Sequence, residues 1–156
     1  MKDVPPEHHH DLDYLLDMLD WDANTDPHFQ SHRLFDPRAV AALDQMADAG
    51  YCEKWVVYST PHYSAKELTI LPGRSATIRD AAAYGLILTQ GHGSIGAHDV
   101  ETPTLIRYGQ MTRDELFVSA GAAREGVKIV NASDAEELVL LKHFGPGNPE
   151  APLHKG

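Results

Sequence analysis

The hydrophobic pattern of the chain changes at Gly50. In residues 12–19, four leucines recur at helical spacing with aspartates between them, which predicts a short amphipathic helix. Asp36, followed by a proline and an alanine-containing run up to Gly50, predicts a second helix over residues 38–49 with Asp36 as its N-cap. Residues 22–35 show no periodicity, so we expect an extended connection between the two helices.

After Gly50 the pattern consists of short apolar runs separated by turn-forming residues. Closely spaced runs without a helical pattern between them predict an all-β fold, an antiparallel sandwich or barrel. A parallel α/β fold is excluded because its strands need helix-length crossovers. The predicted strands are Trp55–Tyr58, Ala65–Leu71, Ser75–Ile78, Tyr84–Thr89, Ser94–Ile95, Thr104–Tyr108, Glu115–Val118, Val127–Val130 and Glu137–Lys142. We therefore expect an acidic helical arm or connector over residues 1–50, a β-barrel over 51–149 and a flexible tail over 150–156. The segment after Phe144 is rich in glycine and proline, and we expect it to leave the domain surface as coil.

Composition and charge narrow the range of partners. The 156 residues carry 13 Lys and Arg against 23 Asp and Glu, a net charge of -10, and 42% of them are hydrophobic, as in an ordinary globular domain. Residues 1–50 hold 11 acidic and 3 basic side chains, whereas residues 51–156 hold 12 and 10. Because the sequence has no cluster of Lys and Arg, we expect neither nucleic acid nor an anionic membrane surface as a partner.

The sequence also lacks targeting signals. It has no run of about 18 apolar residues and no signal-peptide pattern at the N-terminus, so we expect a cytoplasmic protein. Cys52 is the single cysteine, and we interpret it as a small packed residue rather than a nucleophile.

Several phrases after residue 50 resemble the cupin superfamily, and in particular the C-terminal cupin of bacterial two-cupin proteins similar to class I mannose-6-phosphate isomerase. The phrases are Ser64–Leu68 with Pro72-Gly73, Ala83–Gly85 with Gln90–Gly93, Pro103–Arg107 with Gln110, Asp114–Val118, Asn131 and Lys142–Gly147. The resemblance spans roughly residues 53–149. It implies a cupin-type double-stranded β-helix, a jelly-roll barrel, with an N-terminal helical arm that looks like the connector of the longer proteins.

The metal-binding motifs of cupins are degenerate in this sequence. When the first motif is laid on the chain, its glutamate falls on Tyr84 and its second histidine on Asp80 or Arg79. The histidine of the second motif falls on Arg124 or Val127. Divalent transition metals need several imidazoles or carboxylates that converge, and only Asp80 retains a ligand type. The resemblance therefore does not carry the catalysis of the family over to this chain.

A non-standard metal site is the alternative. Strand ends from distant parts of the sequence meet at one mouth of a barrel, so His92, Glu115 and His143 could together bind a divalent Zn, Mn or Fe ion. With such a metal to polarise a carbonyl, Glu115 or His92 could act as the base of a sugar-phosphate isomerase. Each residue also has a simpler interpretation, with His92 in a turn, Glu115 as a surface charge and His143 as a donor to a neighbouring carbonyl.

An anionic ligand is a further hypothesis. Arg79 and Arg124 fall at positions that point into the barrel in cupins, where a guanidinium must pair with a carboxylate such as Asp80 or with a ligand anion. Tyr84 and Gln90 would offer groups suited to sugar hydroxyls. The predicted ligand-binding residues are Arg79, Asp80, Tyr84, Gln90, Arg107 and Arg124.

Two functions therefore stay open. The first is a binding or assembly module for a small molecule, a sugar or sugar phosphate, with no assigned cofactor; the second is a metal-dependent sugar-phosphate isomerase or related enzyme. The leucine face of residues 12–19, with Trp21 beside it, has no obvious partner in a small barrel. We expect a homodimer in which this arm covers part of the partner or of its own sheet, or pairing with a second cupin domain.

Overall fold

The computed structural model describes residues 3–34, 36–104 and 108–153. The chain divides into two compact units, Met1–Phe35 and Asp36–Gly156. The boundary lies at residue 35 rather than at Gly50, because the segment before Gly50 packs with the first long strand of the second unit.

The first unit consists of short helices. They are η1 (Pro6–His8), α1 (Leu12–Asp17), α2 (Trp21–Asn24) and α3 (Phe29–Arg33). The side chain of Asp11 caps α1 by accepting a hydrogen bond from Tyr14 N at 3.1 Å, and Asp20 caps α2 in the same way. The helix expected in residues 12–19 is thus present, whereas the extended connection expected over 22–35 is wrong because local caps and turns fold it into short helices.

The second unit begins with a strand and a helix. β1 (Arg38–Ala39) pairs with the strand that follows Gly50, and α4 (Leu43–Asp48) starts only after Ala42. The helix predicted over 38–49 is therefore shorter than expected, because the backbone of Arg38 and Ala39 is engaged in sheet pairing. Its predicted stop is confirmed, since Gly50 adopts φ +86°.

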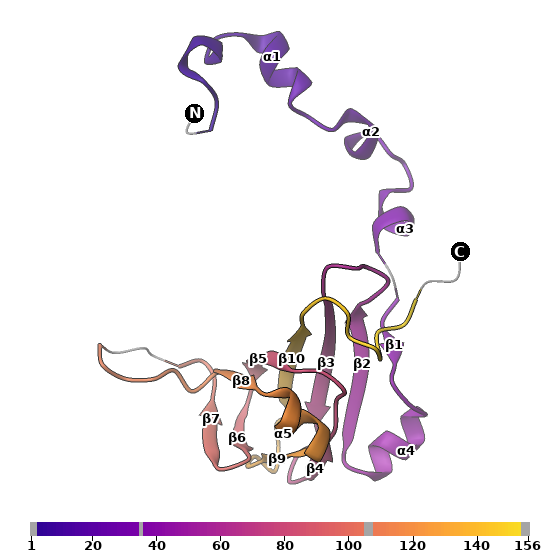
Figure 1. Ribbon diagram of the computed structural model, residues 1–156, viewed down its shortest axis with the longest axis vertical. Helices are drawn as coiled ribbons and strands as arrows, with labels where there is room; N and C mark the ends of the chain where they lie inside the picture. Colours follow the sequence, from indigo (N-terminus) through magenta and orange to yellow (C-terminus); the bar gives the residue numbers. More distant parts are fainter. Residues whose placement is uncertain (1–2, 35, 105–107, 154–156) are drawn as a thin grey trace. The chain divides into compact units, whose positions relative to one another are not determined.

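Nine further strands are found among the described residues of the body. They are β2 (Tyr51–Val57), β3 (Ser64–Ile70), β4 (Ser75–Ile78), β5 (Tyr84–Gln90), β6 (His92–Ile95), β7 (His98–Glu101), β8 (Glu115–Val118), β9 (Val127–Asn131) and β10 (Leu138–Phe144). One antiparallel sheet has the order β1-β2-β3-β10-β5-β8 and the other the order β4-β9-β6-β7 (Figure 1). From β3 onward, β3, β5, β8 and β10 belong to the first sheet and β4, the hairpin β6–β7 and β9 to the second, so the chain passes back and forth between the sheets, as in a jelly roll. The all-β jelly-roll class expected from the sequence is confirmed.

Most predicted strands are present, with ends that lie within four residues of the expected ones. The pattern missed β7 and the helix α5 (Ala120–Glu125), whose N-cap Ser119 accepts a hydrogen bond from Ala122 N at 3.3 Å. The strand expected over Thr104–Tyr108 includes residues 105–107, which lie outside the described residues.

The core lies between the two sheets. Alternate side chains of each strand point inward, and the most buried apolar ones come from both sheets. They are Leu68, Ile70, Leu86, Ile129, Leu138 and Leu140. No helix of the described residues is long and apolar enough to cross a membrane.

The segment after β10 turns back onto the body. Ser59 N donates to Pro152 O at 3.1 Å, and Asn148 is buried. The expected departure of this segment from the surface is therefore wrong for residues 145–152, because these contacts hold it against the end of the barrel.

Candidate functional site

Four charged side chains lie in the interior of the barrel. Glu53 on β2, Lys66 on β3 and Lys142 on β10 occupy inward positions of adjacent strands, and Asp80 follows β4. Their exposed fractions are between 0% and 4%. Ionised groups at this depth are stable only when they are paired.

Asp80 bridges the two lysines. Its Oδ1 lies 2.7 Å from Lys66 Nζ and its Oδ2 lies 2.7 Å from Lys142 Nζ. Glu53 completes the cluster, pairing through Oε1 with Lys142 and through Oε2, at 3.8 Å, with Lys66 Nζ. Two ammonium groups thus face two buried carboxylates, and the four charges balance.

Aromatic rings surround these charges. Lys66 Nζ lies 4.6 Å from the centroid of the Trp55 ring, and Lys142 Nζ lies 5.0 Å from that of Tyr84. Both ammonium groups also lie over the Phe144 ring. The ring faces stabilise the cations that burial removes from water.

The electrostatics of the cluster favour charged lysine and neutral tyrosine. Burial lowers the pKa of the Lys66 ammonium, but Glu53, Asp80 and Glu150 outweigh this effect and leave the pKa above its ordinary value. Burial raises the pKa of the Tyr84 hydroxyl, and the nearby charges of Asp80 and Glu53 raise it further. The Tyr84 hydroxyl is buried and has no hydrogen-bond partner among the described residues.

One end of the cluster is closed by residues 145–152. Glu150 Oε2 lies 3.4 Å from Lys66 Nζ, and Asn148 Nδ2 donates to Ser64 Oγ at 3.4 Å. Cavities border this segment. One, of about 250 Å³, is lined by Ser64 and Asn148 among others, and another, of about 480 Å³, by Trp55 and Glu150 among others. A further cavity, of about 470 Å³, reaches only Gly145 of the segment.

The structure places the predicted ligand-binding residues in two environments. Asp80 and Tyr84 lie in the barrel interior. Arg79 and Arg124 do not point inward, since both are exposed and Arg124 Nη1 donates to Ala81 O at 3.4 Å. The expected pairing of these arginines with Asp80 is therefore replaced by the lysine pairs.

The strand alternation explains the position of Arg79. Ile78 and Asp80 are buried on either side of it, so Arg79 falls on the outward phase. Gln90 is likewise exposed, and its Nε2 donates to Glu137 O at 3.4 Å rather than into the barrel. Arg107 lies outside the described residues.

The three proposed metal ligands do not converge. His92 is exposed on β6 of the smaller sheet, while Glu115 and His143 are exposed on β8 and β10 of the larger one. His143 points outward because its neighbours Lys142 and Phe144 take the inward positions of β10. Among the described residues, no group of three or more His, Cys, Asp or Glu side chains is placed to hold a metal ion.

The lysines were missed although the sequence contains a signal for them. Lys66 lies two residues before Leu68, and Lys142 lies between Leu140 and Phe144, so each is in phase with inward apolar positions. A charged residue at an inward, otherwise apolar position of a strand indicates either that the strand is wrongly assigned or that the charge is buried and paired. In this protein the charges are buried and paired.

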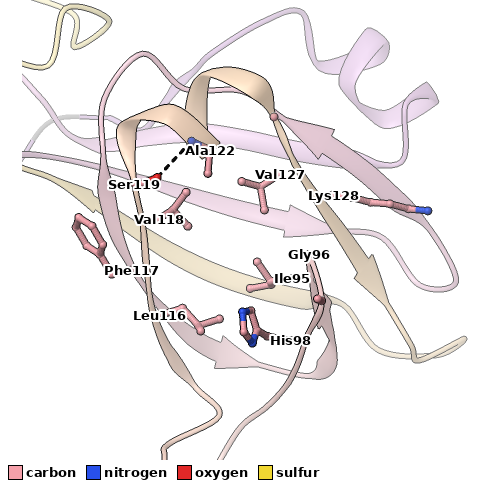
Figure 2. Close-up of a pocket in the computed structure, with 12 residues that line it drawn as sticks. Ile95, Gly96, His98, Leu116, Phe117, Val118, Ser119, Ala122, Val127 and Lys128 are labelled. Atoms are coloured by element: carbon pink, nitrogen blue, oxygen red, sulfur yellow. Dashed lines mark hydrogen bonds between the residues drawn. The ribbon is translucent and has the colours of Figure 1, made fainter.

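A larger cavity than those beside residues 145–152 lies elsewhere in the body. It is a groove of about 600 Å³ bordered by β8, α5, the start of β9 and the β6–β7 turn. Figure 2 shows that Ile95, Leu116, Val118 and Val127 point into it, whereas Lys128 points away. The lining is apolar and offers few polar groups that could orient a sugar.

Comparison with known proteins yields only structural likenesses. Neither a protein-family model nor a curated protein sequence matches the chain. Among solved structures, the chain is similar to a cupin-2 domain from Rhodospirillum rubrum, with 13% identity and a TM-score of 0.44 over 68% of this chain and 66% of that one. It is also similar to an RmlC-like cupin protein from Ralstonia eutropha, with 8% identity and a TM-score of 0.42 over 62% and 57%.

A cupin 2 conserved barrel domain protein from Rhodopseudomonas palustris is a third similar structure, with 14% identity and a TM-score of 0.45 over 78% of each chain. This chain covers less than two thirds of the first two structures. Likenesses at these values carry neither a ligand nor an activity over to this chain.

Proposed function

We propose that this protein is a small cupin-type barrel that binds a small molecule, a sugar or sugar phosphate, without a metal ion. The observation that carries the proposal is the buried cluster of Lys66, Lys142, Asp80 and Glu53 at the centre of the barrel. Its Lys66 ammonium also pairs with Glu150, which borders a cavity at the end of the barrel, so a cation of the cluster lies near space that a ligand can enter. We also propose that this barrel is related to the mannose-6-phosphate isomerase-like group of cupins.

The ligand site that we propose lies at the end of the barrel closed by residues 145–152. The centre itself is filled by the charged cluster and its aromatic neighbours, whereas cavities border the closing segment. The hydroxyl of Ser64 and the amide of Asn148 line one of them, and both can exchange hydrogen bonds with sugar hydroxyls.

The alternative, a metal-dependent sugar-phosphate isomerase, has less support. It requires His92, Glu115 and His143 in one site, and the described residues do not bring them together. The barrel interior does not replace that site, because two ammonium groups repel a divalent cation and a protonated amine is not a ligand.

Titration calorimetry on untagged protein tests the proposal. Mannose 6-phosphate and mannose are titrated before and after treatment with EDTA, and we expect binding that EDTA leaves unchanged. Ser64→Ala should weaken binding, whereas Ser75→Ala, an exposed serine on β4, should not. Stoichiometric Zn, Mn or Fe that disappears in His92→Ala or His143→Ala, together with isomerase activity, would establish the enzyme instead.

Self-association is the second part of the proposal. We propose a homodimer, or pairing with a second cupin domain, because large apolar side chains stay exposed in both units. Leu12 and Leu16 are examples in the first unit, and Ile87 and Phe117 are examples on the outer face of the larger sheet.

A further inference from the structure

We propose that Glu150 occupies an anion site on Lys66, and that an external phosphate displaces it together with the closing segment, residues 145–152. The proposed ligand is thus a small molecule that carries a phosphate group. This inference rests on the proposed binding function and specifies the ligand class and the regulation of that site.

Glu150 differs from the other carboxylates of the cluster in its exposure. Its side chain is 40% exposed, whereas those of Lys66 and Glu53 are 5% exposed and those of Lys142 and Asp80 are fully buried. Among the described partners of Lys66, Glu150 is therefore the one that lies at the surface, between Lys66 and solvent. A ligand that approaches this end of the barrel meets Glu150 first.

The charge balance allows Glu150 to leave. Without it, the two ammonium groups still face the carboxylates of Asp80 and Glu53, and Lys66 keeps its 2.7 Å contact with Asp80. A buried charge becomes costly when it loses its last partner. Detachment of Glu150 avoids this cost, because both buried ammonium groups stay paired. An external anion that binds Lys66 takes the place of the negative charge of Glu150.

The closing segment is held by few contacts. Besides the Glu150 pair, Pro152 O accepts from Ser59 N at 3.1 Å and from Ser59 Oγ at 3.3 Å, and Asn148 Nδ2 donates to Ser64 Oγ at 3.4 Å. Ala151 is the residue of this segment that packs against the hydrophobic core. None of the described residues after Phe144 belongs to a strand. Segments with few buried contacts and no ladder of hydrogen bonds open most readily.

The cavity of about 480 Å³ offers a second cation. Arg38 lines it together with Trp55 and Glu150, so a ligand there has access to a guanidinium and, once Glu150 has moved, to the Lys66 ammonium. A guanidinium binds a planar or tetrahedral oxyanion through two parallel hydrogen bonds. The volume of about 480 Å³ is within the range of small-molecule pockets.

Trp55 provides a direct measure of opening. It lines this cavity and contacts Lys66, and the chain contains only one other tryptophan, Trp21. In a Trp21→Phe background, acrylamide quenching of the Trp55 fluorescence reports access to the barrel end without any ligand. Glu150→Gln removes the charge and keeps the shape, and Glu125→Gln, an exposed carboxylate on α5, is the matched control.

We expect Glu150→Gln to increase Trp55 quenching and to bind inorganic phosphate and mannose 6-phosphate about tenfold more tightly, because the competing closed state loses its ion pair. Glu125→Gln should match the parent in both measurements. Thermal unfolding of each variant shows that the body remains folded.

Two results would overturn the inference. One is equal quenching in the two variants, which shows that Glu150 does not close the site. The other is phosphate affinity in Glu150→Gln equal to or below that of Glu125→Gln, including undetectable binding in both. Binding of uncharged mannose in the same experiment would then still support the proposed binding function, and its absence together with that of mannose 6-phosphate would overturn that function separately.

Discussion

Asp80 is the residue on which the charge balance of the barrel interior depends, because each of its carboxylate oxygens contacts a different buried ammonium. Asp80 was expected from the sequence only as a pairing partner for inward arginines, and Tyr84 as a ligand-binding residue. Lys66 and Lys142 were not predicted, because pairing between β3 and β10 brings them together across 76 residues of sequence and no local pattern encodes that register. The frame wrongly placed Arg79 and Arg124 inward, and only the folded sheet shows which charges meet in the interior.

Replacement of Asp80 by Asn should therefore be strongly destabilising. The amide keeps the shape but leaves two buried ammonium groups with one buried carboxylate, that of Glu53, and we expect a loss of about 3–5 kcal/mol in the free energy of unfolding. Urea denaturation measures it. The control is Glu67→Gln, which breaks the partly exposed 2.9 Å pair with Lys54 and should cost less than about 1 kcal/mol. Equal losses in the two variants would contradict a buried, balanced cluster.

Tyr84→Phe should leave the protein as stable or make it more stable at neutral pH. The buried hydroxyl has no partner among the described residues, so its removal relieves a desolvation cost of about 1 kcal/mol. A loss of more than that amount would show that the hydroxyl is hydrogen-bonded in solution. The same urea measurement applies.

The pH dependence gives a second readout for Tyr84. The pKa values of Tyr84 and Lys66 are both raised in the folded state, so the folded protein holds these protons more tightly than the unfolded chain. Their contribution is complete below the ordinary values of about 10 and is lost as the pH rises through the higher folded values. We expect the urea midpoint to fall above about pH 10, less steeply in Tyr84→Phe.

The elements were predictable where one physical signal dominates. Alternation of apolar and polar residues identified most strands, and Gly50 identified the end of α4. The signals failed where two structures compete for the same residues. Arg38 and Ala39 have a helical context, but they pair with β2, so sheet pairing decides their structure. α5 is a helix of six residues between two strands, and the local cap by Ser119 decides its structure.

Gly85 on β5 is a test of element packing. It lies opposite His143 of β10, and a Cβ at this position would lie 2.2 Å from His143 Nε2. The imidazole therefore covers the glycine on the outer face of the sheet. We expect Gly85→Ala to cost about 1–3 kcal/mol in the free energy of unfolding through overpacking.

A double-mutant cycle with His143→Ala separates overpacking from other causes. Removing the imidazole should recover most of the loss in the Gly85→Ala, His143→Ala double variant, because the clash involves that side chain alone. Additive losses would show that the alanine disturbs the strand itself.

At the scale of the whole molecule, the acidic segment of the sequence, residues 1–50, coincides only in part with the first compact unit of the structure, Met1–Phe35. The sequence places the change at Gly50, while the compact body begins at Asp36, since β1 and α4 belong to it. The jelly-roll topology was predicted through the cupin resemblance, not through strand spacing, which allowed a sandwich or a barrel alike. The strand order depends on long-range pairing, and a pattern of strands does not contain it.

The two units should respond differently to proteases. The helices η1, α1 and α2 contain no buried side chain, so the first unit resists opening far less than the strands of the body. We expect brief digestion with chymotrypsin to remove residues before about position 36, leaving a resistant fragment that mass spectrometry identifies. Cleavage within β3 or β10 at the same rate would contradict the division.

The homodimer is tested on the full chain by light scattering. Exposed apolar side chains on two surfaces, Leu12 at 72% and Phe117 at 75%, favour association, and we expect twice the 17.2 kDa chain mass at micromolar concentration. Leu12→Ser with Leu16→Ser should produce a monomer if the arm forms the interface, and Phe117→Ser should do so if the outer face of the larger sheet forms it. A mass of one chain in the unmodified protein across that concentration range would exclude the homodimer. A dimer that survives both sets of substitutions would place the interface on neither surface.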